Sequence, residues 1–385
     1  MKRVSRATFA LMVVACTGLF GASFLHAQGA AEQPMLAGKA FKNVTVMKDI
    51  PVDQFMQTMG FFSASLGMSC EDCHKAKDTD WSGFAVDNPV KNTARRMIQM
   101  MQKINEDNFA GRQLVTCYSC HRSADAPRSV PNFEELYGAV PSDPNAVIVQ
   151  SPLAPKPEEV LDKYLAAVGG AQKAATLTSL VARGNNVGYG PEGAQDKRAV
   201  QLYAKPTQRV ITIQTTNGLS TTTFDGKAGW MAAPLRPFDV MPVVGQELEG
   251  LRIDAALMFP SQVKQIATRW RVGNPVSLDG KDQWVVQGNT TGGVILSLYF
   301  DQQTGLLTRA VRYAASIVGR IPVQTDYSDY RDVNGVKVPH KFTFTWLDGR
   351  DTFELTQVQA NANIEAARFN KPAPSAAPAP RAGAR

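Results

Sequence analysis

The sequence contains no dense cluster of Lys and Arg interleaved with aromatic residues, which a nucleic-acid-binding protein would use to neutralise phosphates. It also has no Ser/His/Asp arrangement, phosphate-binding loop or paired-carboxylate signature. Hydrophobic residues make up 44% and charged residues 19% of the 385 residues, which excludes a disordered polypeptide and a multi-span membrane protein. We therefore expect about two soluble domains and no nucleic-acid partner.

Residues 1–27 are typical of a secretory signal peptide. Lys2, Arg3 and Arg6 precede an uncharged apolar run that ends in Leu25-His26-Ala27. Two alternatives stay open, namely acylation of Cys16 as in a bacterial lipoprotein, and retention of the run as a membrane anchor. All three would deliver the rest of the chain outside the cytoplasm, and we predict the periplasm.

Cysteine is scarce, and its spacing carries the main functional signal. After the signal peptide only four cysteines remain, and they form C-x-x-C-H twice, at residues 70–74 and 117–121. This is the attachment signature of c-type haem. Cysteines three residues apart lie on one side of a helical turn, where both sulfurs can form thioethers with the haem vinyl groups. The pattern predicts two covalently bound haem c groups.

The predicted ligands follow from the motif. The thioether residues are Cys70, Cys73, Cys117 and Cys120, and the proximal axial ligands to iron are His74 and His121. A four-cysteine zinc site is a weaker hypothesis, because 43 residues separate Cys73 from Cys117, against about 15–20 in the usual zinc arrangement. Two local disulfides or a thioredoxin-like site would also use C-x-x-C pairs. Zinc also gives no reason for a histidine after both pairs, and a thioredoxin-like site would need only one pair in a βαβ context.

Histidine is too scarce to supply the distal ligands. The chain has four, of which His26 leaves with the signal and His340 lies far away in a strand-like segment, where we expect it to be partly exposed. Methionines are concentrated before each motif, at positions 47, 56, 59 and 68 and at positions 97, 100 and 101. A thioether is therefore the expected distal ligand, although methionines at helical spacing usually fill a core.

A helical pattern precedes each motif. The first runs from Pro51 to Leu66 and ends at Gly67, and the second starts at Asn88-Pro89 and continues through Ile104. A helix rises about 1.5 Å per residue, so a methionine in the first helix and its motif could not serve one haem if the helix continued. The break at Gly67 lets the chain fold back.

Several short segments resemble the cytochrome subunit of bacterial photosynthetic reaction centres, over about residues 41–122. The segments are Lys42-Asn43-Val44, Phe55 to Met59, Arg95-Arg96-Met97, Ile104-Asn105 and Val115 to His121. The resemblance implies units of helix, turn and haem motif, with Met59 as the distal ligand of the first haem and Met97 as that of the second. The well-known members have four haems, and this chain matches only the first pair. The family's distal histidine between the second helix and its motif is missing from residues 105–116.

The C-terminal half is predicted to be rich in antiparallel strands. Seven prolines between residues 127 and 157 indicate a linker, and the next domain spans residues 158–370 and opens with a helix over 158–168. Period-two patterns predict about eight to ten strands, interrupted by a helical segment near residues 245–259, and Asn-Gly or Asp-Gly pairs such as Asn334-Gly335 predict hairpin turns between strands. The strand over Val336–Trp346 places three aromatic residues on one face. The Ala/Pro-rich tail, residues 371–385, is expected to be disordered.

The sequence thus predicts two domains: a mostly α-helical dihaem cytochrome c domain, residues 28–126, and an α+β domain with a curved antiparallel sheet or half-barrel. The second is loosely similar to periplasmic lipoprotein-carrier half-barrels, which bind acyl chains, so an apolar ligand there stays open.

The predicted function is one-electron transport between a donor and an acceptor redox protein, with both irons held by His/Met pairs. A membrane-associated complex also stays open as the setting. Arg95, Arg96 and Arg112 are candidates to neutralise haem propionates. The competing hypotheses are a peroxidase-like dihaem enzyme with one open iron site, and a lipid- or quinone-binding protein with a redox domain.

Overall fold

The computed structural model describes residues 33–75, 81–138, 148–189, 195–234, 236 and 238–375. The predicted signal peptide, residues 1–27, and residues 376–385 of the predicted tail lie outside these ranges. None of the described helices is long and apolar enough to cross a lipid bilayer.

The N-terminal part is helical, as the sequence predicts. Its elements are α1 (Ala37–Ala40), α2 (Val52–Leu66), α3 (Cys70–Cys73), the 3-10 helix η1 (Trp81–Ala85), α4 (Pro89–Phe109), α5 (Cys117–His121) and α6 (Phe133–Tyr137). Helix α2 ends at Gly67, whose φ of 62° is left-handed and suits a residue without Cβ. Helix α4 begins after Asn88, whose side chain accepts a hydrogen bond from the Lys91 amide at 2.9 Å.

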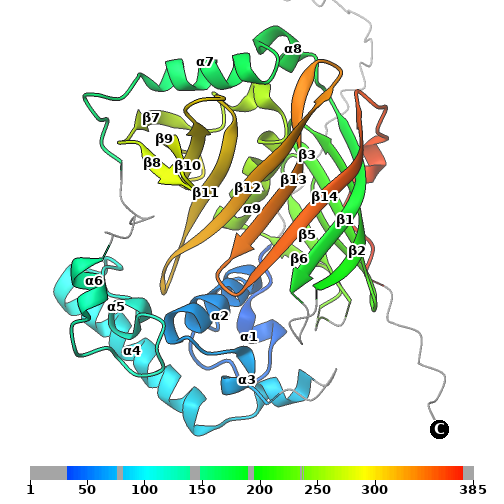
Figure 1. Cartoon of the computed structure of the whole chain (residues 1–385). Helices are drawn as coiled ribbons and strands as arrows, with labels where there is room; N and C mark the ends of the chain where they lie inside the picture. The colour runs from blue at the N-terminus through cyan, green and yellow to red at the C-terminus, as the bar shows by residue number, and fades with distance from the viewer. Residues whose placement is uncertain are drawn as a thin grey trace, which may run out of the picture. The chain divides into compact units, whose positions relative to one another are not determined.

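The C-terminal part contains one large antiparallel sheet (Figure 1). Its strands are β1 (Leu180–Tyr189), β2 (Gln195–Lys205), β3 (Gln208–Thr215), β4 (Gly218–Phe224), β5 (Gly229–Ala232), β6 (Met241–Val243), β7 (Thr268–Val272), β8 (Val276–Leu278), β9 (Lys281–Asn289), β10 (Ile295–Asp301), β11 (Leu307–Ser316), β12 (Gly319–Val333), β13 (Val336–Trp346) and β14 (Gly349–Ala360). The order is β6-β5-β4-β3-β2-β1-β14-β13-β12-β11-β10-β9-β7, with β8 also paired to β9. The first strand therefore pairs with the last.

The described residues form fourteen strands, so the predicted eight to ten was too low. The difference comes from short strands such as β6, which has three residues, all buried. A segment of that length is too short to show a period of two. The Asn334-Gly335 turn between β12 and β13 was predicted correctly, and both residues have positive φ, 56° and 81°.

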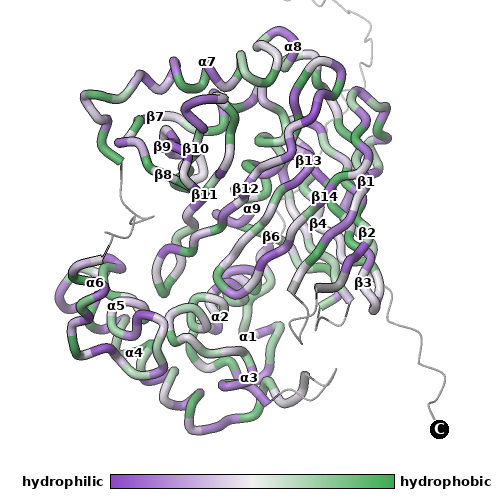
Figure 2. Tube along the Cα trace, viewed as in Figure 1, coloured by the Kyte–Doolittle hydropathy of each residue, from purple (hydrophilic) through white to green (hydrophobic). Residues whose placement is uncertain are grey.

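Helices cover parts of the sheet. They are α7 (Pro157–Ala167), α8 (Ala171–Ala175) and α9 (Gly245–Ala256), with 3-10 helices η2 (Pro260–Gln262) and η3 (Ala366–Phe369). Hydrophobic and hydrophilic residues alternate along α7 (Figure 2), and its buried Tyr164 packs on Phe300 of β10 at 5.3 Å between ring centroids. Helix α9, which the sequence predicts, contacts β2, β3, β4 and β11.

Side chains of the helical part pack against loops of the sheet within one compact unit that starts at Gln33. Phe61 of α2 and Met101 of α4 form a buried cluster with Val318 and Ile321 of the β11–β12 hairpin. Asp53 in the first turn of α2 accepts a hydrogen bond from the backbone N–H of Val244, which precedes α9, at 2.8 Å. These contacts join segments that are far apart in the sequence.

His340 was predicted to be partly exposed, and this prediction was wrong. This residue of β13 is 7% exposed, and its Nδ1 lies 3.0 Å from the carbonyl oxygen of Val338. The pairing of β13 with β12 and β14 determines this burial, which alternation within β13 alone could not reveal.

Candidate functional site

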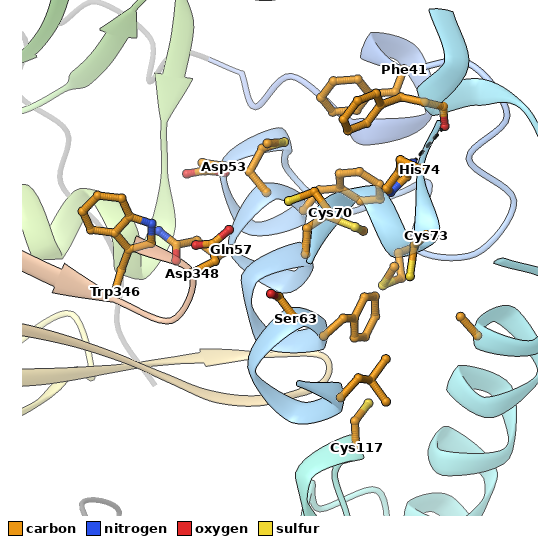
Figure 3. A pocket seen from close by; sticks show the side chains of 18 of the residues that line it. Phe41, Asp53, Gln57, Ser63, Cys70, Cys73, His74, Cys117, Trp346 and Asp348 are labelled. Carbon is orange, nitrogen blue, oxygen red and sulfur yellow. Dashed lines mark hydrogen bonds between the residues drawn. The ribbon is translucent and has the colours of Figure 1, made fainter. Parts of the chain in front are cut away.

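Both C-x-x-C-H motifs line one large cavity of about 1,730 Å³. The predicted ligands that line it are Met59, Cys70, Cys73, His74, Met97, Cys117, Cys120 and His121. Figure 3 shows Cys70, Cys73 and His74 on one side of the cavity and Cys117 further along it. The structure therefore brings all eight cysteine, histidine and methionine residues predicted as haem ligands to one cavity.

The four cysteines of the motifs are free thiols. Within the described ranges, no group of three or more His, Cys, Asp or Glu side chains gathers into a metal site. Burial raises the pKa of the Cys70 and Cys117 thiols, and Asp348 raises that of Cys70 further, so both thiols are protonated near neutral pH.

The first motif forms a single helical turn. The Asp72 carboxylate accepts hydrogen bonds from the backbone N–H of Ser69 at 2.7 Å and from its hydroxyl at 2.9 Å, which fixes the start of α3. His74 follows the turn in an extended conformation, with φ of −119° and ψ of 135°. The motif thus places its histidine just outside the helix that carries its cysteines.

The His74 ring is oriented by Phe84. Its Nδ1 lies 3.2 Å from the Phe84 carbonyl oxygen, and the two rings stack at 4.5 Å between centroids (Figure 3 shows the hydrogen bond). A carbonyl oxygen can only accept, so Nδ1 carries the proton and Nε2 keeps its lone pair. Burial and the neighbouring Lys91 lower the pKa of His74, which favours the neutral imidazole that binds metals.

The chain after the first motif is held by a polar network. Asn88 donates to the carbonyl of Cys73 at 2.8 Å, while Asn43 donates to the Asp87 carboxylate at 2.8 Å. Arg95 pairs with the same carboxylate at 2.7 Å, and these two partners lower the pKa of Asp87. The network assigns a structural role to Asn43, for which the sequence offered only its place in the family resemblance.

The second motif lies on α5 and includes its histidine in the helix. Thr116 and Ser119 cap the start reciprocally, because Ser119 N–H donates to the Thr116 hydroxyl at 3.3 Å and Thr116 N–H donates to the Ser119 hydroxyl at 3.0 Å. Nδ1 of His121 lies 3.0 Å from the carbonyl oxygen of Ala124, so again Nε2 keeps its lone pair. After the helix, Ser123 N–H donates to the carbonyl of Ser65 at 2.9 Å.

Asn105 is a site residue whose role the sequence alone did not reveal. This residue of α4 is 4% exposed, and its amide oxygen accepts from the backbone N–H groups of Leu114 and Val115 at 3.0 and 2.9 Å. Its amide nitrogen donates to the carbonyls of Met101 and Val115 at 3.1 and 2.7 Å. Asn105 therefore ties α4 to the strand-like segment that leads into Cys117. Its position in the Ile104-Asn105 segment of the resemblance was the only signal.

The methionines of α4 occupy different environments. Met101 is 4% exposed and belongs to the core cluster with Phe61, Val318 and Ile321. Met97 is 37% exposed and lines the cavity, as does Met100. Met101 also lines the cavity but is buried in this cluster, whereas Met97 and Met100 are the exposed methionines of α4 on the cavity wall.

The three arginines predicted to neutralise haem propionates differ in the hydrogen bonds and ion pairs that they already make. Arg95 lines the cavity and is bound to Asp87 and to Asn92 at 2.9 Å. Arg96 is exposed and donates to the Thr93 hydroxyl at 3.0 Å, and Arg112 donates to the Phe109 carbonyl at 3.3 Å. Among the three, only Arg95 lines the cavity.

The residues present fit covalent haem. The cavity offers free thiols in two pairs, a histidine behind each pair with Nε2 available, thioether side chains and apolar walls that include Phe41, Phe55 and Phe62. This set of donors on short helical turns is typical of c-type cytochromes.

Comparison with known proteins agrees with this class. Residues 23–217 match the family of the photosynthetic reaction centre cytochrome c subunit, and the chain belongs to this family. A photosynthetic reaction centre cytochrome c subunit from Roseobacter denitrificans is 35% identical over 103 residues, which are 25% of this chain and 27% of that protein. The subunit from Thermochromatium tepidum is 32% identical over 96 residues, 24% of this chain and 23% of that protein. The chain thus spans about a quarter of the length of these relatives.

The C-terminal part resembles solved structures of LolA-like proteins. A LolA superfamily protein from Nitrosomonas europaea covers 57% of this chain and 99% of its own, at 13% identity and a TM-score of 0.40. An outer membrane lipoprotein-sorting protein domain from Vibrio parahaemolyticus covers 55% of this chain and 95% of its own, at 11% identity and a TM-score of 0.39.

Proposed function

We propose that the chain is an exported dihaem c-type cytochrome that transfers single electrons between redox proteins. The thioether residues are Cys70 with Cys73 and Cys117 with Cys120, and the axial ligands are His74 with Met59 and His121 with Met97. Haem c, when bound, accepts and releases one electron at its iron. The family and the two motifs support this reading.

The orientation of the two histidines is the observation that carries the proposal. In both motifs a backbone carbonyl three or ten residues further along the chain accepts from Nδ1, at 3.0 Å for His121 and 3.2 Å for His74. This second contact fixes the tautomer and ring plane, and it raises the basicity of the free nitrogen. Surface histidines without a shared role would not be expected to make the same Nδ1 hydrogen bond to a backbone carbonyl in both motifs.

The chain's own residues also set the environment. Apolar and aromatic side chains line the cavity around the motifs, and an apolar surrounding favours the less charged form of an iron site. Thioether ligation raises the reduction potential relative to two histidines. We therefore infer that both iron sites have a relatively high reduction potential and accept electrons readily.

The proposed setting is the periplasm, reached through the signal peptide at residues 1–27. Because relatives in the family are subunits of photosynthetic reaction centres, a membrane-associated electron-transfer complex is the partner class we propose. The individual donor and acceptor are redox proteins that dock beside the motifs.

Spectroscopy of methionine variants tests the ligand assignment. The purified protein should contain two haems by mass and show low-spin iron at both, with Met-to-iron(III) charge transfer in the near infrared. Met59→Ala and Met97→Ala should each convert one haem to high spin.

Met56→Ala and Met100→Ala are matched controls, because these exposed residues lie three positions from the assigned ligands and also line the cavity. Both controls should stay low spin. A high-spin iron in the unaltered protein would favour the peroxidase-like enzyme, and a change of spin state in the controls alone would overturn the assignment.

A further inference from the structure

The arginines that line the cavity differ in their partners. Within the described part of the chain, four arginines belong to the lining, and three of them face a carboxylate. The pairs are Arg95 with Asp87 at 2.7 Å, Arg209 with Asp254 at 3.6 Å, and Arg312 with Glu247 at 3.4 Å. The fourth, Arg236, lies between β5 and β6 and pairs with no carboxylate of the described residues. Its guanidinium is therefore free to meet a negatively charged ligand.

Arg236 is accessible and yet surrounded by protein. The residue keeps exposed surface, unlike Arg312, which is 6% exposed. Burial by the surrounding protein nevertheless lowers the pKa of Arg236. A side chain that has exposed surface while protein surrounds it lies inside a hollow, so an anion that enters the cavity can reach this guanidinium. Their attraction is stronger there than on an open surface, because less water screens it.

Aromatic contacts bring Arg236 to the end of the cavity where the first haem motif lies. Phe238, two residues after Arg236, meets the ring of Phe41 at 6.3 Å between centroids. Phe41 in turn stacks on Phe55 of α2 at 5.4 Å. Figure 3 shows Phe41 on the same side of the cavity as His74. The segment between β5 and β6 is thus attached to the helical part beside the first motif.

The stretch around Phe41 is also tied to the first motif by a hydrogen bond. The side-chain amide of Asn43 donates to the carbonyl of Ala85 at 2.8 Å. Ala85 directly follows the phenylalanine whose carbonyl orients His74. Two independent contacts therefore place Arg236 near the support of the first proximal histidine.

The first motif needs positive charge that the helical part supplies only sparingly. A haem has two propionates, and a carboxylate in a poorly hydrated cavity is costly unless a positive group faces it. Arg95 is already bound to Asp87, and Lys91 donates to two backbone carbonyls at 2.6 and 2.7 Å. Lys42 is the other lining cation of this part, and it is an exposed lysine. Arg236 adds a planar guanidinium, which can bind a carboxylate through two parallel hydrogen bonds.

We propose that Arg236 binds a propionate of the first haem, so that the C-terminal part of the chain contributes a residue to the haem site of the N-terminal part. This inference rests on the proposed function. The guanidinium compensates one carboxylate charge and favours its ionised form. A positive group near the iron also favours the reduced state, which has one positive charge less. Arg236 therefore raises the reduction potential of the first haem.

Potentiometric titration of the haem-loaded full chain tests this assignment. The first haem is identified as the one that Cys70→Ala with Cys73→Ala removes. Arg236→Leu should shift the reduction equilibrium of the first haem about tenfold toward the oxidised form, or about 59 mV for one electron, and leave the second haem unchanged. The potential of the first haem should also become more dependent on pH near neutrality, because an unpaired propionate takes up a proton more readily on reduction.

Three further variants locate the effect. Arg236→Lys keeps the positive charge and should restore most of the potential. Lys227→Leu is the matched control, because it removes an exposed positive charge from the turn between β4 and β5, outside the cavity lining, and it should change neither haem. Lys42→Leu tests the lysine of the helical part. If Lys42→Leu lowered the potential and Arg236→Leu did not, the C-terminal part would have no role in the haem site.

The outcomes separate this inference from the proposed function. Two covalent haems with unchanged potentials in Arg236→Leu would overturn the role of Arg236 alone, and so would a shift confined to the second haem. Absence of covalent haem from the unaltered protein would overturn both proposals. Because Arg236 is exposed, its substitution should leave the fold intact, and haem content measured by absorbance checks this in every variant.

Discussion

The two C-x-x-C-H units have the same donors but different supports. In the first, His74 follows α3 in an extended conformation and rests on Phe84 through both a hydrogen bond and ring stacking. In the second, His121 stays inside α5, and Asn105 anchors the segment that enters the motif. The first unit is thus supported by Phe84 of η1, and the second by the buried amide of Asn105. The same set of donor residues can therefore be positioned by different local structures.

Removal of one cysteine pair at a time should have the largest effect, because it should abolish one of the two units and leave the other. Cys70→Ala with Cys73→Ala, and Cys117→Ala with Cys120→Ala, should each lower the covalently bound haem by half, because each pair is proposed to attach one group. Haem content per protein and intact mass measure this. If either double variant kept two covalent haems, or lost both, the one-pair-per-haem assignment would be wrong.

Asn105→Ala should affect the second unit more than the first. The change removes four hydrogen bonds to backbone groups in a buried place, so the free energy of unfolding should fall by about 2–4 kcal/mol. Denaturant unfolding measures the loss. Asn108→Ala is the control on the same helix, because Asn108 is exposed and makes one bond to the Ile104 carbonyl. A loss equal to that of the control would contradict the anchoring role.

The starts of α2 and α4 should respond differently to pH. Burial raises the pKa of Asp53 from 3.8 to about 6, with the Glu247 charge adding to it. A carboxyl whose folded pKa is raised destabilises the fold above about pH 6, and this cost disappears as the pH falls toward 3.8. Asp53→Asn should therefore raise the free energy of unfolding at pH 8 by up to about 3 kcal/mol relative to its effect at pH 4.

Denaturant unfolding at the two pH values measures this difference. Asp49→Asn alters an exposed carboxyl and Asn88→Asp introduces one at the start of α4, and neither should reproduce it. A pH-independent effect of Asp53→Asn would show that the buried carboxyl is not the source.

Phe84→Leu should have the smallest effect on stability. It tests whether the aromatic support belongs to His74 and not to His121. It keeps the carbonyl that accepts from His74 but removes the stacked ring, which contributes about 1 kcal/mol. Thermal unfolding measures the loss, and paramagnetically shifted resonances of the two proximal histidines should change for His74 alone. An equal change at His121 would show that the aromatic support is shared.

Local signals in the sequence predicted local structure well. Gly67 ends α2, Asn88 and Pro89 start α4, and Asn334-Gly335 forms the β12–β13 turn, because each depends on backbone conformations within a few residues. The donors of the candidate site follow from the motif for the same reason.

Long-range features could not be predicted in this way. Asp53 and the Val244 amide are 191 residues apart in the sequence, and no pattern in either segment predicts their hydrogen bond. The burial of His340 depends on strands β12 and β14, and the position of the Arg312 guanidinium depends on Gly250 of α9, where a Cβ would collide with it. Such contacts are set by tertiary packing, which a single sequence does not display.

The position of Cys117 against the β11–β12 hairpin has a consequence for biogenesis. Its sulfur-bearing side chain packs on the cluster that Phe61 and Met101 form with Val318 and Ile321. An attachment enzyme needs access to this thiol, and access is greatest while the downstream chain is still unfolded. Under the proposed haem assignment, maturation at the second motif should accordingly precede closure of the hairpin, so the polypeptide would acquire its pigment before its sheet is complete.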